Sequence, residues 1–122
     1  MNLSSEDFEK IVKEELDSLP EEVISKTNNV AFLIEDYPTP DQEKKFRLGR
    51  GYFLFGLYEG YHQSSRRNLG AVLPDRITLF KYAILHESKN EKELRMMISN
   101  TIKHEIAHHF GSDEAGARKA SR

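Results

Sequence analysis

The chain has 122 residues, of which 38% are hydrophobic, and it contains seven Gly, four Pro and no Cys. This composition is that of a globular protein rather than a disordered or fibrous one, and the absence of cysteine excludes disulfides and thiolate metal sites. Eighteen basic residues against twenty acidic ones leave no strong net charge, and no stretch approaches the roughly 20 apolar residues of a membrane span, so we expect neither nucleic acid nor a membrane as a partner.

The length favours a single domain over residues 1–122, with residues 117–122 frayed because the last segment has few apolar side chains. The first ten residues include early acidic side chains and no apolar signal segment, which predicts a cytoplasmic protein. A chain this short has little room for a second lobe. Any active site is therefore expected to be assembled from one sheet and a few helices.

Two helices are predicted at the start of the chain. Ser4 is a favourable N-cap with Asp7 three residues later, and apolar residues then repeat at helical spacing until Pro20. These apolar positions are Phe8, Ile11, Val12, Leu16 and Leu19. Pro20 suits the first turn of a short second helix, which should end near Asn28. The first helix is amphipathic, so it should pack against another part of the protein.

Two segments have the composition of strands. Residues 30–34 (VAFLI) form an unbroken apolar run with prolines beyond it, which predicts a buried strand at the centre of the sheet. Residues 76–82 (RITLFKY) are rich in β-branched and aromatic side chains and predict another strand. The aromatic segment 52–61 contains Gly56 and Gly60, which weaken its assignment to either helix or strand.

A long helix is predicted from Asn90 onward. Asn90 can cap it, with Glu93 at the capping-box position, and Gly111 is a natural C-terminal stop. Residues at helical spacing define the face that should be buried. They are Leu94, Met97, Ile98, Thr101 and Ile102.

Within this helix stands His104-Glu105-Ile106-Ala107-His108, the HExxH pattern. Residues four apart lie one turn above each other on the same helix face, so His104 and His108 can bind one metal ion. Glu105 lies about 100° from His104 around the helix axis, near enough to reach a metal-bound water without binding the metal. The pattern predicts a zinc site with Glu105 as its catalytic base.

Coincidence is the main alternative, since composition alone places HExxH in roughly 2% of shuffled sequences. On a helical wheel, the three imidazoles and the carboxylate of His104, Glu105, His108 and His109 fall within the arc of the buried face. Buried polar groups are unfavourable unless something such as a dication satisfies them, so a metal site is favoured over chance. His109 lies about 100° from His108, too far to bind the same ion, and is expected to orient a ligand or to pack.

A third protein ligand is needed to leave one coordination position open for water. Gly111 can adopt the left-handed conformation that turns the chain back, and Glu114 stands ten residues after His104. The extended pattern H-E-x-x-H-x-x-G-x-x-ligand places its last ligand there. Asp113 is the alternative. Both acids could instead be merely solvated side chains at the helix end, although a helix C-terminus is unfavourable for anions. The spacing favours Glu114 and leaves Asp113 open.

The chain resembles the minimal zincin-like metallopeptidases, small bacterial proteins formerly grouped as a domain of unknown function. The resemblance rests on HEIAHHFG with acidic residues after it, on LPDRITLF, on LFGLYEG and on the strand followed by prolines, and it spans about residues 30–114. It implies an α+β fold in which a small mixed sheet, with the N-terminal helices, has the HExxH helix packed beneath it.

The same resemblance implies one zinc ion per chain, bound by two His and an acidic side chain. The family places Asp followed by Glu at the position ten residues after the first His. This chain instead reads Gly111-Ser112-Asp113-Glu114 and is one residue shorter.

These features predict a zinc metallopeptidase that hydrolyses peptide bonds through a metal-activated water and Glu105 as general base. The alternative is a catalytically silent zinc-binding module with an interaction or regulatory role, in which the metal mainly holds the C-terminal segment in place. The presence of Glu105 favours catalysis, because a purely structural site has no use for a carboxylate beside its ligands.

The expected substrate is a peptide or protein, bound as an added strand along an exposed sheet edge. We predict that this edge is the strand that precedes the motif helix. Its substrate-binding residues are Arg76, Ile77, Thr78, Leu79 and Phe80. Arg76, Tyr82 and Tyr58 are also candidates to stabilise an oxyanion, although a structural role is favoured for each.

Overall fold

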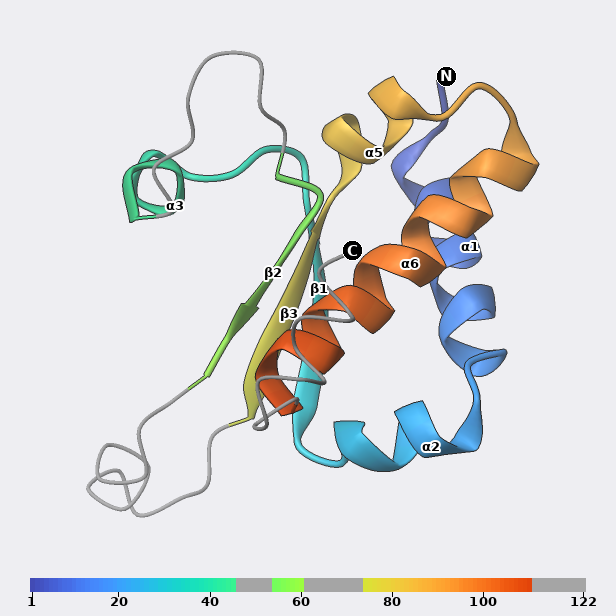
Figure 1. Ribbon diagram of the computed structural model, residues 1–122. Helices are drawn as coiled ribbons and strands as arrows, with labels where there is room; N and C mark the ends of the chain where they lie inside the picture. Colours follow the sequence, from blue (N-terminus) through green and yellow to red (C-terminus); the bar gives the residue numbers. More distant parts are fainter. Residues whose placement is uncertain (46–53, 61–73, 111–122) are drawn as a thin grey trace.

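The computed structural model describes residues 1–45, 54–60 and 74–110 (Figure 1). Three strands form a small sheet, and helices from both ends of the described chain pack on it. Within the described residues no helix is long and apolar enough to cross a membrane.

The sheet is mixed, with β3 (Asp75–Phe80) between β1 (Val30–Glu35) and β2 (Gly56–Glu59). β1 is parallel to β3, with Val30 opposite Asp75, whereas β2 is antiparallel to β3, with Gly56 opposite Leu79. The predicted α+β class with a small mixed sheet is confirmed.

The prediction that residues 30–34 form the central strand is wrong. Within the described sheet β1 pairs with β3 alone, and Leu33 in its middle is 38% exposed. β3 is the central strand, with Ile77, Thr78, Leu79 and Phe80 all buried. An apolar run indicates that side chains are buried, but it does not reveal how many strands lie beside the backbone.

The two N-terminal helices form as predicted. α1 (Ser5–Asp17) begins after Ser4, whose Oγ accepts a hydrogen bond of 3.1 Å from the Asp7 N–H. Its buried face contains Phe8, Ile11 and Val12. After Pro20 come the short helix α2 (Glu21–Ile24) and the 3-10 turn η1 (Ser25–Thr27). A further short helix, α3 (Pro40–Lys45), follows β1.

The predicted strand over residues 76–82 is too long at its C-terminal end. β3 ends at Phe80, and α5 (Lys81–Glu87) begins at the next residue. The side chains of Lys81, Ile84 and Leu85 are buried, at spacings of three and four that suit one helix face. Tyr82 is of a residue type common in strands, but the helical spacing of the buried side chains from Lys81 onward marks where the strand ends.

The last helix, α6 (Glu91–Phe110), is capped as predicted. Asn90 Oδ1 accepts from the Glu93 N–H at 2.9 Å, and Glu93 Oε1 accepts from the Lys89 N–H at 3.0 Å. The buried positions along its length repeat every three or four residues. They are Leu94, Ile98, Thr101, Ile102 and Ile106.

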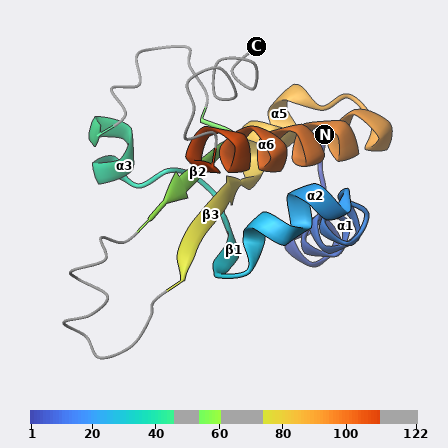
Figure 2. The same cartoon turned by 60° about the horizontal axis from the view of Figure 1, so that its bottom comes forward.

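α1 and α6 lie side by side against one face of the sheet, as the two views agree (Figures 1 and 2). The hydrophobic core fills the space between these helices and the strands. Its buried members are Phe8, Ile11, Val12, Leu19, Ile77, Leu79, Ile84, Leu85, Leu94, Ile98, Ile102 and Ile106. Packing of α6 on the sheet fixes where the C-terminal half of that helix, which carries the HExxH motif, meets β2 and β3.

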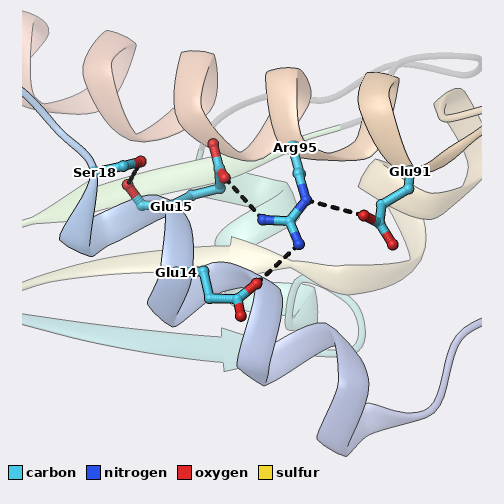
Figure 3. A network of polar contacts seen from close by, with 5 residues as sticks. All are labelled: Glu14, Glu15, Ser18, Glu91 and Arg95. Carbon is cyan, nitrogen blue, oxygen red and sulfur yellow. Dashed lines mark hydrogen bonds and ion pairs between the residues drawn. The ribbon is translucent and has the colours of Figure 1, made fainter.

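A charged cluster ties α1 to α6 outside this core (Figure 3). Arg95 on α6 donates to Glu14 at 2.8 Å and to Glu15 at 3.1 Å, both on α1, and to Glu91 on its own helix at 3.3 Å. These carboxylates raise the pKa of Arg95 above its ordinary value. The guanidinium fork is suited to several acceptors at once, so it orients the two helices relative to each other.

Candidate metal centre

The two histidines of the HExxH motif lie one turn apart in the C-terminal half of α6. Their ring centroids are 4.8 Å apart and the ring planes meet at 61°. The side chain of His104 is partly buried and that of His108 is exposed. The helix therefore brings two imidazoles onto one side, as the four-residue spacing predicts.

Glu105 is held against the sheet by a backbone donor. The N–H of Tyr58, in β2, donates to Oε1 of Glu105 at 3.1 Å. Burial raises the pKa of the Glu105 carboxyl above its usual value, and His104, the Tyr58 N–H and His108 oppose this rise by favouring the charged form. The carboxylate thus lies at a partly dry position next to two imidazoles.

Tyr58 links Glu105 to a buried carboxylate on the central strand. The Tyr58 hydroxyl donates to Oδ2 of Asp75 at 2.8 Å, and Asp75 is only 8% exposed. The backbone N–H of Asp75 donates in turn to the Asn29 carbonyl at 3.0 Å. Ring and backbone of Tyr58 are both held, so its N–H has a fixed direction.

The donor set fits a divalent transition metal as far as the described residues go. His104 and His108 are accessible imidazoles on one helix side, and Glu105 stands beside them without being part of the pair. No group of three His, Cys, Asp or Glu that could hold a metal is present within the described ranges. The predicted third ligand, Glu114 or Asp113, lies outside them, as do the side chain of His109 and residues 117–122.

The wheel projection placed the motif too deep. His108 is exposed and His104 only partly buried, whereas Ile102 and Ile106 continue the fully covered stripe of α6. The imidazole of His108 is consequently open to solvent, and that of His104 is partly so.

The predicted substrate-binding edge at Arg76, Ile77, Thr78, Leu79 and Phe80 is wrong. These residues belong to β3, which has β1 on one side and β2 on the other. Both backbone edges of β3 are used in strand pairing, so no peptide can be added there. Position in the chain just before the motif helix does not determine position in the sheet.

Two of the predicted oxyanion candidates have partners away from the motif. Arg76 forms an ion pair with Glu59 at 3.3 Å, and Glu59 also accepts from Gln42 of α3 at 3.3 Å. Tyr82 stacks on Tyr37 with ring centroids 4.9 Å apart. These contacts support the structural reading of both side chains.

Sequence reasoning missed the contact between β2 and Glu105. The backbone N–H of Tyr58 has no signature in the sequence, because every residue other than proline carries one. Gly56 did offer a signal: a glycine inside a strand often marks a close approach of another segment. Here the nearby segment is α6, with Cγ2 of Thr101 beside Gly56.

Comparisons with known proteins agree with this architecture. The profile of a family described as zincin-like metallopeptidase matches residues 27–120, more than half of the chain. Among solved structures, a conserved hypothetical protein from T. thermophilus has a TM-score of 0.59 and 20% identity, over 92% of this chain and 98% of that one. At such an identity the likeness concerns the fold alone. No curated protein matches the chain.

Proposed function

Because the chain belongs to the zincin-like metallopeptidase family, as its resemblance predicted, we propose that it is a zinc-dependent peptidase with Glu105 as the general base. His104 and His108 would hold one zinc ion per chain together with Glu114 or Asp113. Bound there, zinc would polarise a peptide carbonyl and lower the pKa of a water molecule towards neutrality.

The position of Glu105 is the observation that carries this proposal. Its carboxylate lies beside the two imidazoles. The Tyr58 N–H donates to Oε1 at 3.1 Å and so fixes the direction of the carboxylate. A general base must be held within hydrogen-bond reach of the proton that it takes. Glu105 accepts a proton from the attacking water and delivers it to the leaving amine, so no covalent intermediate is required.

Burial makes this carboxyl a stronger base than an exposed one. The pKa of Glu105 is raised, so the ionised form has a greater affinity for a proton. The substrate that fits this chemistry is a peptide or protein. Since β3 is enclosed on both sides, a peptide that reaches Glu105 would approach from β2, the outer strand in contact with α6.

Elemental analysis and a cleavage assay test the proposal together. The freshly purified parent should carry about one zinc per chain and cleave an unstructured protein substrate. His104→Ala should lose both. Glu105→Gln should keep the zinc and lower the cleavage rate by orders of magnitude, because only proton transfer is lost.

Several results would contradict it. Stoichiometric zinc in His104→Ala removes the proposed site, and loss of zinc in Glu105→Gln makes Glu105 a ligand. A parent that holds zinc and cleaves none of the peptides in a diverse library is the silent binding module instead. The same zinc measurements compare Glu114→Ala with Asp113→Ala: loss of a direct ligand should weaken zinc by more than the roughly 10-fold to 100-fold typical of supporting residues.

A further inference from the structure

β2 and α6 approach each other closely at Gly56. A methyl group at this position would lie 2.5 Å from Cγ2 of Thr101 and 3.3 Å from the carbonyl oxygen of Thr78. The first distance is far below a van der Waals contact, so a side chain at position 56 would require the Thr101 side chain, or the strand and helix themselves, to shift. Gly56 is therefore required by this packing and not by a turn.

The contact between Tyr58 and Glu105 lies one step further along the same two elements. From Thr101 to Glu105 the helix rises about 6 Å, at 1.5 Å per residue. From Gly56 to Tyr58 the strand advances about 6.6 Å, at roughly 3.3 Å per residue. The two advances match, so β2 and α6 run side by side in the same direction, with the two contacts as successive steps (Figure 1).

The donor at Tyr58 belongs to the outer edge of β2. The Phe80 N–H donates to the Phe55 carbonyl at 2.9 Å, which fixes the alternation of the antiparallel ladder. Backbone groups of Leu57 then face β3, whereas those of Gly56 and Tyr58 face away from it, and the Tyr58 N–H meets Glu105 of α6. An outer-edge N–H of the sheet is thus bonded to a helix side chain.

We propose that Gly56 and Tyr58 are positioning residues for Glu105. The absent side chain at Gly56 lets α6 lie close to β2, and the Tyr58 N–H, anchored through its ring to Asp75, then fixes one carboxylate oxygen. Among the described contacts only Oε1 is engaged, which leaves Oε2 to accept the proton. This assignment rests on the proposed function, because it concerns the same reaction.

Amide hydrogen exchange of the metal-free full chain tests the geometry without any activity. In the parent, the Tyr58 amide should be protected. Gly56→Ala should speed its exchange by about 10-fold or more, because the bond to the carboxylate is stretched or lost. Glu105→Ala, which removes the acceptor, should do the same. The Phe80 amide, bonded within the sheet, should change little in both variants and so reports that the sheet is intact.

A compensating substitution distinguishes spacing from general damage. Thr101→Ser removes only the Cγ2 methyl that a side chain at position 56 would meet, and by itself it should leave Tyr58 exchange within about twofold of the parent. Combined with Gly56→Ala, it should restore most of the Tyr58 protection. Unchanged Tyr58 exchange in Gly56→Ala, or failure of the double variant to recover while the Phe80 amide stays protected, would overturn the proposal.

The positioning role proposed for Gly56 and Tyr58 in catalysis is tested by enzyme kinetics. In a parent that cleaves peptides, Gly56→Ala should lower kcat by about 10-fold or more with KM and zinc content near those of the parent, and Thr101→Ser should recover it. Accelerated Tyr58 exchange with an unaltered kcat would refute a positioning role. A parent without zinc or activity would refute the proposed function. The exchange experiment would still show whether Gly56 maintains the hydrogen bond between the Tyr58 N–H and Glu105.

Discussion

At the scale of single residues, the partly buried carboxylate of Glu105 does not by itself favour folding. Its carboxylate is partly removed from water, and the raised pKa shows that burial outweighs the nearby histidines and the Tyr58 N–H. Zinc, once bound, would supply the missing positive charge. Without the metal, the ionised carboxylate should destabilise the folded state.

This reasoning predicts that Glu105→Gln stabilises the metal-free protein at neutral pH. The folded state binds the Glu105 proton more tightly than the unfolded chain, whose carboxyl has the ordinary pKa of 4.5. Stability is therefore lost as pH rises from that value through the raised pKa, and a neutral Gln, which can still accept from Tyr58, avoids this loss. Urea unfolding in the presence of a chelator, at pH 5 and pH 7.5, should show an advantage of the variant that grows with pH.

The exposed Glu9 of α1 supplies the control. Glu9→Gln should change the free energy of unfolding by less than about 0.5 kcal/mol at either pH, as is usual for surface substitutions. A metal-free parent that is more stable than Glu105→Gln at pH 7.5 would show that the carboxylate is stabilised by its surroundings.

At the scale of elements, α6 has two roles along its 20 residues. Its first half supplies Leu94 and Ile98 to the core, and its second half carries the imidazoles of His104 and His108 beside the buried Ile102 and Ile106. The direction of the second half depends on how firmly the first half is held. The Asn90 cap and the bond from Arg95 to Glu14 of α1 both help to hold the first half of α6.

The cap can be tested by itself. Asn90→Ala removes the acceptor of the Glu93 N–H, so it should lower the free energy of unfolding by about 1 kcal/mol. Asn100→Ala, at an exposed position inside the same helix, is the matched control and should be neutral or slightly stabilising, because alanine favours the helix interior. Equal effects of the two substitutions in urea unfolding would mean that the Asn90 cap contributes nothing.

At the scale of the whole molecule, one hydrophobic cluster joins α1, α5 and α6 to the sheet. The central strand β3 contributes Ile77 and Leu79 to it, and α6 contacts both that strand and β2. The candidate metal site is therefore built on the same packing that holds the fold together.

Truncation of this core should be costly. Ile98 is 0% exposed, so Ile98→Ala should lower the free energy of unfolding by about 2–5 kcal/mol through lost burial and the cavity left behind. Met96, on the same helix, is 54% exposed, and Met96→Ala should change it by less than about 0.5 kcal/mol. A loss below about 1 kcal/mol for Ile98→Ala would show that α6 repacks easily and that its contacts do not fix the site.

Local physics determined what the sequence predicted correctly. Ser4 and Asn90 cap helices because their side chains reach a backbone N–H three residues away, and His104 and His108 share a helix side because of the helical repeat. Each of these relations joins residues within one turn, so spacing alone reveals it.

The tertiary structure decided the relations between distant segments. The order of the strands, which makes β3 central, depends on which backbones pair, and an apolar run gives no sign of that. The partner of Glu105 is a backbone N–H 47 positions away, and such a donor has no side-chain signature. The exposure of His108 likewise depends on how other segments pack against α6, which no periodicity within the helix encodes.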